Sequence, residues 1–394
     1  MGPKVLHLIS GGERGGSKKH LLTLLPALRE RGVDVELVCF LDGPLYREAK
    51  EAGIPATLLL QRSRRDPRVI QALVRKVREE GVSLVHALGG RANYAALQVM
   101  GRLSAHANDS RSSAASSPPA FLSTVHSLPR LDYLHQPWWK RLLFTALNLR
   151  ALRRFHHLIA VSQAFAAALE REGIPRRRIS VVYNGIDPAG AARPYSREEL
   201  ERLTGWELQG EEPLLVMVSR LHPVKRIPDF LHALKDLGQR GIPCKALIAG
   251  DGPLRGELAR LIASLGLAEQ VRLLGFRQDV EALLASAHLS VLTSQSESFP
   301  YVLLESGKVG TPALATRVGG IPDLLPDELL FAAGDVAGLT EKLARLLTSP
   351  QDLKQWGEYL RQRVVNRYSL QRLAEDHLTI YRRVLDERKR EREE

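Results

Sequence analysis

Cysteine is scarce in this chain, and long apolar runs are missing. The two cysteines, Cys39 and Cys244, both lie in apolar runs without metal-binding neighbours. A fold held by disulfides or by a zinc cluster is therefore excluded, and a reducing compartment is expected. No apolar run approaches the roughly 20 residues that span a bilayer. Residues 5–9 are too few for a signal peptide and are expected to form a strand.

Several catalytic motifs are also missing. The sequence contains no D-x-D pair, which would seat a metal-bound sugar diphosphate, and no Walker A loop. It also lacks an H-x₃-H zinc arrangement and a G-x-S-x-G nucleophile turn. We therefore expect no metal and no bound cofactor. If a phosphate is bound, cationic side chains and a helix dipole must balance its charge.

Length and charge set further limits. A chain of 394 residues, 44% apolar and 25% charged, is long enough for two ordinary domains. The net charge of +12 is concentrated in residues 1–190, where 28 Lys and Arg stand against 15 Asp and Glu. The remainder is close to neutral. A basic N-terminal half indicates an anionic partner, and an anionic membrane, an acidic acceptor or nucleic acid would each fit.

Short apolar runs alternate with stretches of helical spacing along the chain. This alternation predicts an α/β protein with two doubly wound, Rossmann-like domains of parallel strands, facing a central cleft. A stretch rich in turn-forming residues, 184–213, is the expected linker. Residues 104–119 are expected to form a mobile insertion, and residues 386–394 to fray. The expected strands are 5–10, 35–40, 56–60, 84–88, 121–126, 158–162, 179–183, 214–219, 246–249, 271–274, 289–293 and 313–316.

The stretch S-Q-S-E-S-F-P-Y-V-L-L-E-S-G-K-V-G, residues 294–310, is the strongest candidate for a site. It follows an expected strand and becomes a helix, with Pro300 at the favoured first helical position. Glu297 and Glu305 frame the helix start, and eight helical steps would separate them by roughly 12 Å. We interpret Glu297 as a sugar ligand, the helix end as a diphosphate seat and Glu305 as a ribose ligand. A structural helix start without a ligand explains the stretch equally well.

Four further motifs follow expected strands. The paired glycines of residues 11–17 permit a close backbone approach to a ligand, or form a tight turn. Arg220 and Lys225 could clamp a diphosphate, or belong to a solvated loop. The G-D-G-P turn that begins at Gly250 lies at a strand end, as does His126, which could bond a sugar hydroxyl or be structural.

The ordered set of motifs resembles the retaining glycosyltransferases of family 4, which have the GT-B architecture. The resemblance covers nearly the whole chain. It is carried by G-G at 15–16, V-H at 125–126, I-A-V-S at 159–162, V-V-Y-N-G-I-D at 181–187, S-R-L-x-x-x-K at 219–225, A-G-D-G-P at 249–253, L-L-G-F at 273–276, the glutamates at 297 and 305, and V-G-G-I-P at 318–322.

The resemblance implies an acceptor-binding domain at 1–190, a nucleotide-sugar-binding domain at 191–370, and a C-terminal helix at 371–394 that crosses back toward the first domain and ends in a charged tail. It implies catalytic roles for four residues and donor contacts for seven others. The catalytic set is His126, Arg220, Lys225 and Glu297. The donor set is Gly16, Gly250, Phe276, Ser298, Phe299, Pro300 and Glu305. Ser298, Ser306 and Lys308 depart from the small residues that are usual at these positions, which leaves the donor unidentified.

The resemblance also implies transfer of a hexosyl unit from a nucleotide-diphosphate sugar to an acceptor hydroxyl, with retention and without a metal. UDP-sugars are favoured over GDP-sugars. The expected acceptor is a lipid-linked sugar or a polysaccharide of the cell envelope, and no nucleic acid is expected. A nucleotide-sugar epimerase and a catalytically silent nucleotide-sugar-binding protein remain alternatives.

One basic segment bears on where in the cell the protein acts. The chain is expected to be cytoplasmic. Residues 138–154 contain two Trp and five basic residues without an acidic one, so they could dock on an anionic membrane at the inner face of the cell membrane. A packed helix is the alternative, because Arg150, Arg153 and Arg154 fall among apolar positions.

Overall fold

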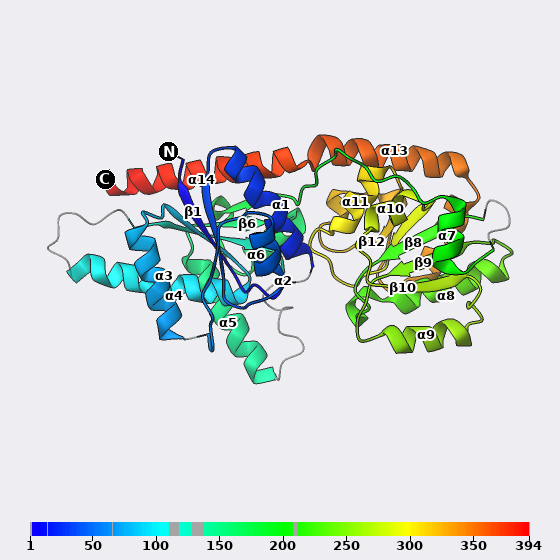
Figure 1. Cartoon of the computed structure of the whole chain (residues 1–394), viewed down its shortest axis with the longest axis horizontal. Coiled ribbons are helices and arrows are strands. Elements are labelled where there is room, and N and C mark those ends of the chain that lie inside the picture. Colours follow the sequence, from blue (N-terminus) through cyan, green and yellow to red (C-terminus); the bar gives the residue numbers. More distant parts are fainter. Residues whose placement is uncertain are drawn as a thin grey trace. The chain divides into compact units, whose positions relative to one another are not determined.

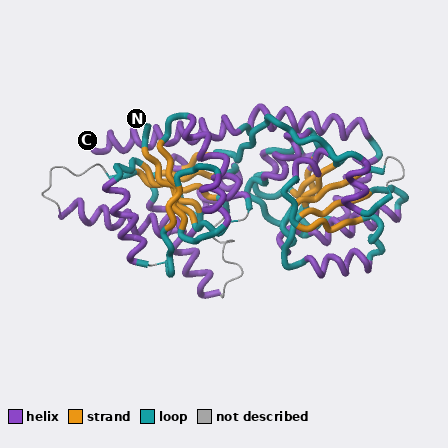
Figure 2. Tube along the Cα trace, viewed as in Figure 1, coloured by secondary structure: helices purple, strands orange, loops and turns teal. Residues whose placement is uncertain are grey.

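The computed structural model describes residues 2–13, 15–64, 66–109, 118–127, 138–207 and 212–393. The chain divides into two compact units (Figure 1). The first contains Met1–Gly185 together with Leu370–Glu394, and the second contains Ile186–Ser369. Each unit is built on one parallel sheet with helices packed around it (Figure 2).

The sheet of the first unit has seven strands in the order β3-β2-β1-β4-β5-β6-β7. All of its pairings are parallel, so both faces need a cover of helices and the strands are largely apolar. The order reverses between β1 and β4, and ligands bind at such switch points in open α/β sheets. The strands are β1 Lys4–Ile9, β2 Asp34–Cys39, β3 Ala56–Leu58, β4 Leu84–Leu88, β5 Ala120–Val125, β6 His157–Ala160 and β7 Ile179–Val181.

The helices of the first unit begin at recognisable signals. Asp66 caps α3 by accepting a hydrogen bond from the Arg68 N–H, and Pro67 follows at the first helical position. Ser162 caps α6 by accepting from the Phe165 N–H. The described helices are α1 Gly16–Glu30, α2 Pro44–Glu51, α3 Pro67–Glu79, α4 Gly90–Asp109, α5 Trp138–Arg154, α6 Gln163–Arg171 and α14 Leu370–Glu393.

Helix α14, the last helix of the chain, packs into the first unit and completes its core. Its buried residues Leu373, Tyr381 and Val384 join a cluster with Leu21 and Leu25 of α1. The prediction that residues 386–394 fray is wrong, because the helix continues through Glu393 with an Arg388–Glu391 ion pair of 2.8 Å. Alternating charges support the last turns, as pairs three or four residues apart do on a helix surface.

The second unit repeats the arrangement with six strands in the order β10-β9-β8-β11-β12-β13. Its switch point lies between β8 and β11. The strands are β8 Leu214–Val218, β9 Lys245–Ala249, β10 Val271–Gly275, β11 Leu289–Leu292, β12 Ala313–Thr316 and β13 Leu330–Phe331. The helices are α7 Arg197–Thr204, α8 Ile227–Gln239, α9 Arg255–Ser264, α10 Val280–Ala285, α11 Tyr301–Val309, α12 Val336–Leu347 and α13 Pro350–Arg367.

The predicted fold class is confirmed, with three local differences. Each of the twelve expected strands is present, whereas β13 was not predicted because two residues leave no periodic signal. Residues 104–109 belong to helix α4 and not to an insertion, while 110–117 lie outside the described residues. Helix α11 begins at Tyr301, so Pro300 is its N-cap and the four residues from Glu297 to Pro300 form a loop. The expected 12 Å helical span between the two glutamates therefore does not apply.

Four histidines of the first unit are buried and a fifth is half-buried. His7, His20, His86 and His377 are at most 1% exposed. His126, directly after β5, is half-buried. Burial is the main cause that lowers the pKa of each ring, to about 3 for His7 and about 4 for His126 and His377, and repulsion from His377 lowers the pKa of His7 and His126 further.

Because of these histidines, we predict that the stability of the first unit falls as the pH is lowered. Because each folded-state pKa lies below the unfolded value near 6.5, the unfolded chain takes up protons first. The stabilising contribution is complete above about pH 6.5 and is lost as the pH falls toward about 4, by up to about 1.4 kcal/mol per pH unit for each ring. Hydrogen–deuterium exchange of β1 and β4 measured across this range would show the loss.

The second unit provides the internal control. Its histidines, His222, His232 and His288, are exposed, so exchange in β8 and β9 should depend much less on pH. If exchange in the two sheets depended equally on pH, the loss of stability could not be assigned to the histidine rings of the first unit.

Candidate functional site

Two oppositely charged side chains meet at the switch point of the second sheet. Lys225 follows β8 and Glu297 follows β11, and Lys225 Nζ lies 2.5 Å from Glu297 Oε1. Their side chains are only 16% and 11% exposed. Ser294 also donates to Glu297 Oε1, at 2.6 Å. Parallel neighbouring strands place their carboxyl ends at one edge, which brings together residues 72 positions apart.

The turn that carries Lys225 is fixed by the end of β11. The Thr293 hydroxyl donates to the carbonyl oxygens of Lys225 and Arg226, and the Gln295 N–H donates to Val224 O. Arg226 has φ of +47°, the one positive value among the described non-glycine residues. Such strain persists where surrounding contacts enforce it, often at functional sites. No local sequence pattern predicts this conformation. Arg226 also pairs with Asp229 at 2.6 Å.

Two glycines allow the loops at this edge to touch. A Cβ on Gly250, at φ +140°, would lie 1.8 Å from Ser219 O, and one on Gly319, at φ +54°, would lie 1.6 Å from Glu297 O. The Gly320 N–H donates to Ser298 O at 2.8 Å, which joins the same two loops. Gly319 therefore fixes the backbone of Glu297, and its role was not recognised from the sequence.

The N-terminus of α11 lies directly after this loop. Its N-cap, Pro300, makes no side-chain hydrogen bond to the helix, and the first turn has no acidic residue. These are the properties of a helix end that receives an anion. Phe299 is buried against Tyr368, with ring centroids 5.1 Å apart, so its backbone and not its ring can face a ligand. Glu305 is half-buried one turn into the helix.

The remaining candidate residues of the second unit lie at the same edge of the sheet. Arg220 follows β8, and its side chain is exposed. Phe276 follows β10 with 73% of its surface exposed, which makes its ring available for stacking. The unusual residues Ser306 and Lys308 have structural partners. Ser306 donates to Thr311 O, and Lys308 pairs with Glu281 at 3.0 Å.

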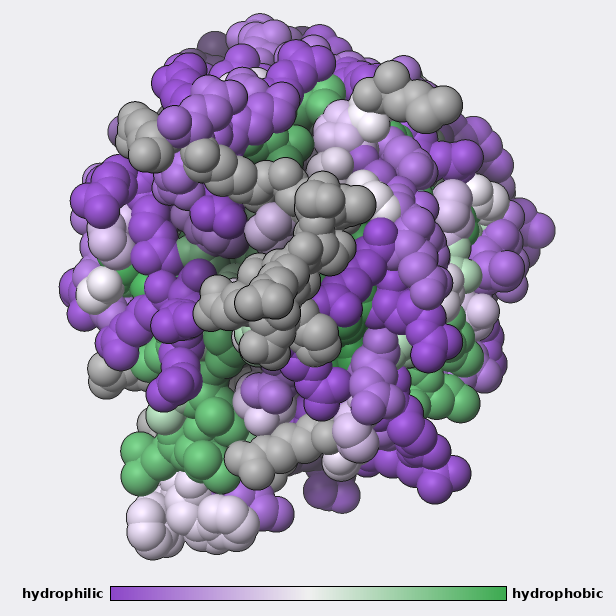
Figure 3. Space-filling model, turned by 90° about the vertical axis from the view of Figure 1, so that its left-hand side faces the viewer, coloured by the Kyte–Doolittle hydropathy of each residue, from purple (hydrophilic) through white to green (hydrophobic). Residues whose placement is uncertain are grey.

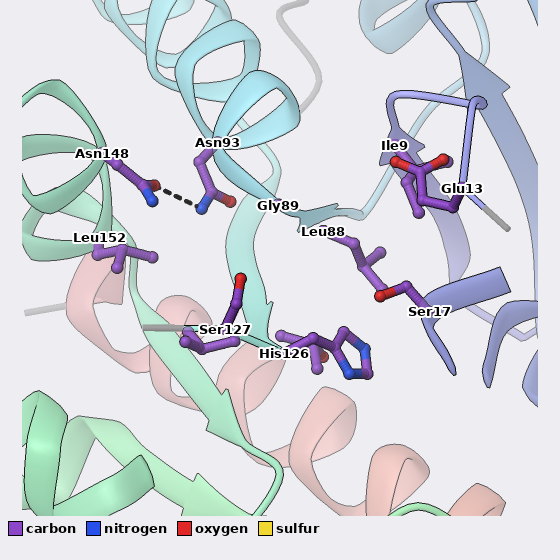
Figure 4. A pocket seen from close by; sticks show the side chains of 12 residues that line it. Ile9, Glu13, Ser17, Leu88, Gly89, Asn93, His126, Ser127, Asn148 and Leu152 are labelled. Carbon is purple, nitrogen blue, oxygen red and sulfur yellow. Dashed lines mark hydrogen bonds between the residues drawn. The ribbon is translucent and has the colours of Figure 1, made fainter. Parts of the chain in front are cut away.

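The first unit has a small pocket of about 70 Å³ at its own switch point. It lies at the carboxyl ends of β1, β4 and β5 and is lined by His126, Glu13 and Ser17, among others (Figure 4). Glu13 accepts a hydrogen bond from the Gly11 N–H at 2.7 Å, and burial raises its pKa. Gly16 begins α1 beside this pocket. Glu13 and Ser17 stand in the glycine-rich motif but were not predicted as site residues.

An amide pair forms the opposite wall of this pocket. Asn93 of α4 donates to Asn148 Oδ1 of α5 at 2.9 Å (Figure 4). The Ser123 hydroxyl donates to Asn93 Oδ1 at 2.8 Å. Both amides are buried, so each needs a partner to offset the loss of water. No motif marks them, because they are distant in sequence and meet only in the fold. Within the described ranges, no group of three or more His, Cys, Asp or Glu side chains is arranged to hold a metal ion.

Two family models match successive parts of the chain. Glycosyltransferase Family 4 matches residues 14–189, and Glycosyl transferases group 1 matches residues 202–363. The chain therefore belongs to the group 1, family 4 glycosyltransferases, a family of retaining hexosyltransferases that use nucleotide sugars.

Curated relatives match part of their length. N-acetyl-alpha-D-glucosaminyl L-malate synthase of Bacillus anthracis is 31% identical over 215 residues, which is 54% of this chain and 55% of the relative. MMP alpha-(1->4)-mannosyltransferase of Mycolicibacterium hassiacum is 29% identical over 262 residues, 63% of this chain and 60% of the relative. The chain thus spans little more than half the length of these relatives.

Solved structures of similar fold match almost the whole length of this chain. Anabaena Alr3699/HepE in complex with UDP and glucose superimposes with a TM-score of 0.79 at 20% identity, over 96% of this chain and 99% of that one. Sucrose-phosphate synthase of Thermosynechococcus elongatus gives a TM-score of 0.77 at 19% identity, over 98% and 99%. These matches establish the GT-B fold.

The contact between Gly319 and Glu297 gives a testable prediction. Gly319→Ala should lower the free energy of unfolding of the second unit by at least about 3 kcal/mol, because its methyl group would overlap a backbone oxygen. Gly266→Ala is the matched control, since Gly266 also has a positive φ but open space around it. It should cost about 1 kcal/mol. Urea unfolding compares the two, and equal losses would show that the contact is unimportant.

Proposed function

We propose that this chain transfers a hexosyl unit from a nucleotide-diphosphate sugar to an acceptor hydroxyl, with retention of the anomeric configuration and without a metal. The observation that carries the proposal is the Lys225–Glu297 pair at the switch point, directly before the N-terminus of α11. A cation, a carboxylate and a helix end that favours anions are the groups that a sugar diphosphate requires.

Each part of the donor has a candidate partner. Lys225 and Arg220 would contact the diphosphate, together with the first N–H groups of α11 and the backbone of residues 298–300. Glu297 would contact the sugar, Glu305 the ribose, and Phe276 the base, with Gly250 at the neighbouring turn. UDP is favoured as the nucleotide because similar solved structures contain UDP and UDP-glucose.

The proposed chemistry is a front-face substitution. The acceptor hydroxyl attacks the anomeric carbon on the side from which the nucleotide diphosphate departs, so the configuration is retained. A phosphate oxygen of the leaving group takes the hydroxyl proton. Negative charge grows on the diphosphate as the glycosidic bond breaks, and Lys225, Arg220 and the α11 N-terminus stabilise it in place. His126 of the first unit would hold a sugar hydroxyl.

The acceptor is proposed to be a lipid-linked sugar of the cell envelope, reached at an anionic membrane. The C-terminal half of α5 is packed, with Ala151 and Leu152 buried and Arg153 bonded to Glu172 O. The N-terminal half projects, and Trp138 and Leu142 are 75% and 63% exposed.

Trp139 and Leu143, on the same projecting half of α5, are also exposed. Figure 3 shows apolar and weakly polar side chains gathered at the lower edge of the face in view. Tryptophan and leucine beside basic residues favour insertion at a membrane interface. None of the helices in the described parts of the chain combines the length and apolarity needed to cross a bilayer.

A donor screen tests the proposed activity. UDP-, GDP- and ADP-sugars should be compared for slow hydrolysis and for thermal stabilisation, and a UDP-hexose should give the largest effect. A product in the retained configuration, identified by proton NMR, is expected when an acceptor is present. Isomerisation of the donor without any acceptor would favour an epimerase, and binding without turnover would favour a silent binding protein.

Substitution of Lys225 tests the diphosphate assignment. Lys225→Ala should lower turnover by a factor on the order of 100, because one preorganised charge is lost where charge develops. Lys245→Ala is a suitable control, since Lys245 lies at the start of β9, at the opposite edge of the same sheet. A decrease of less than a few-fold for Lys225→Ala would remove this residue from the site.

Liposome co-sedimentation tests the proposed surface of α5. Replacing Trp138 and Trp139 by Ala should weaken binding to phosphatidylglycerol vesicles on the order of tenfold through lost apolar burial. Binding of the unmodified chain should decrease at high salt. Leu60→Ala is the control, because Leu60 is 62% exposed elsewhere on the first unit. Indifference to anionic lipid, or equal effects of both variants, would contradict membrane docking.

A further inference from the structure

Five histidines and a tyrosine form a continuous group inside the first unit, buried except for the half-buried His126, and the proposed reaction uses only His126. They come from five elements: His7 from β1, His20 from α1, His86 from β4, His126 from the end of β5, and His377 with Tyr381 from α14. Neighbouring rings along the group have centroids 4.6 to 6.5 Å apart. We refer to these six residues as the histidine cluster.

The hydrogen bonds of the cluster determine two of its tautomers. His20 Nδ1 lies 3.2 Å from Asn184 Oδ1, and His377 Nδ1 lies 2.8 Å from Leu373 O. Both oxygens only accept, so each Nδ1 carries the proton. The Nε2 atoms of both rings are therefore lone-pair nitrogens, and neither has a partner among the described residues. These two rings are held in one orientation from their Nδ1 side.

The far end of the cluster is joined to α14 by direct hydrogen bonds. The Tyr381 hydroxyl lies 2.7 Å from His86 Nδ1 and 3.2 Å from His7 Nε2. His86 Nε2 is 2.8 Å from Thr124 Oγ1, which lines the small pocket. His7 contacts the rings of His86 and Tyr381, so it lies on the side of the cluster away from His126.

The other end of the cluster reaches the pocket itself. His126 lines that pocket and lies between the end of β5 and Ser17 of α1 (Figure 4). Its ring meets His20 edge-on, with centroids 4.6 Å apart and planes at 73°. His20 in turn lies 5.7 Å from His377. The ring of His126 is thus supported by a ring from α1, which is supported by a ring from α14.

We propose that His20 and His377 are positioning residues for His126, which hold its imidazole in one orientation at the small pocket of the first unit. The inference rests on the proposed function, because it requires that His126 holds a sugar hydroxyl. It gives α14 a part in turnover beyond completing the core. A ring fixed by other rigid side chains keeps its contact geometry, and small displacements of a binding group are costly to catalysis.

The surroundings also keep His126 uncharged. The groups that face it are His20 from α1, His377 from α14 and His86 from β4, with Glu13 on the opposite side of the pocket. Burial, and then repulsion from His377, lower the pKa of His126 to about 4. A neutral imidazole has one donor and one acceptor nitrogen, so it can accept a sugar O–H at neutral pH, and a protonated ring cannot.

Two variants remove the support without removing its anchoring hydrogen bonds. In His20→Asn, the side-chain amide can still donate to Asn184 while the ring that meets His126 is lost. His377→Asn does the same at Leu373 O. His7→Gln is the matched control, because it perturbs an equally buried histidine of the cluster that does not meet His126. Each variant is compared with the full chain for kcat, donor KM, melting temperature and imidazole ¹⁵N NMR of labelled histidines.

We expect His20→Asn and His377→Asn to lower kcat about tenfold or more, with a smaller change in donor KM. The His126 resonances should shift in both variants. In His377→Asn, the acidic limb of the kcat profile should move to higher pH, since a repulsive neighbour is gone. His7→Gln should lower the melting temperature to a similar degree, keep kcat within about twofold, and leave the His126 resonances in place.

Other results would overturn the inference. Equal kcat losses in all three variants, or an unshifted His126 signal in His20→Asn, would show that the cluster only stabilises the core. If His126→Asn turns over as fast as the unmodified chain, the reaction does not need the His126 ring and the inference fails. The activity of the unmodified chain would still support the proposed function. If the unmodified chain transfers no sugar from any donor, the proposed function itself fails, and this is seen before any variant is made.

Discussion

The pairing of Lys225 with Glu297 is the interaction on which the site of the second unit depends. Removing two charges from water is costly, and one ion pair alone seldom offsets that cost. Here Ser294 supplies a further hydrogen bond to Glu297, and Thr293 anchors the turn that carries Lys225. Gly319 lets a third loop close over the Glu297 backbone. The loops are thereby preorganised around a cation and a carboxylate, which is the condition that the proposed stabilisation of a developing charge requires.

The first unit has a comparable arrangement at the switch point of its own sheet. A parallel sheet whose strand order reverses leaves an open position at the carboxyl ends of two central strands. In the first unit that position is occupied by Glu13, Ser17 and His126, and in the second by Lys225 and Glu297. The polar character beneath the first site is unusual, because imidazoles replace the apolar side chains that normally fill such a core. Buried rings of this kind are retained only where hydrogen bonds and close packing compensate for lost water.

Much of the fold could be predicted from the sequence, because strands and helices leave patterns among neighbouring residues. Buried parallel strands are short apolar runs, helices have their own periodicity, and the two alternate along the chain, so twelve strands and two doubly wound domains followed directly, whereas the GT-B class came from the family resemblance. The failures have equally physical reasons. Strand β13 is too short to show a period, and the charged end of α14 was taken for a frayed tail although its ion pairs are compatible with a helix. Lys308 and Ser306 departed from the expected pattern, and each proved to have a structural partner in its own unit.

The sequence alone determined which segments end at a sheet edge and which charged residues stand there, since strand ends and motif spacing are properties of neighbouring residues. It named Lys225, Glu297 and His126 one at a time. Tertiary structure decided that Lys225 touches Glu297 across 72 positions, that Arg226 adopts a left-handed conformation, and that Asn93 meets Asn148. It also decided that histidines from five separate elements share one interior. Contacts of this kind depend on strand order and helix packing, and no local pattern of residues encodes those distances.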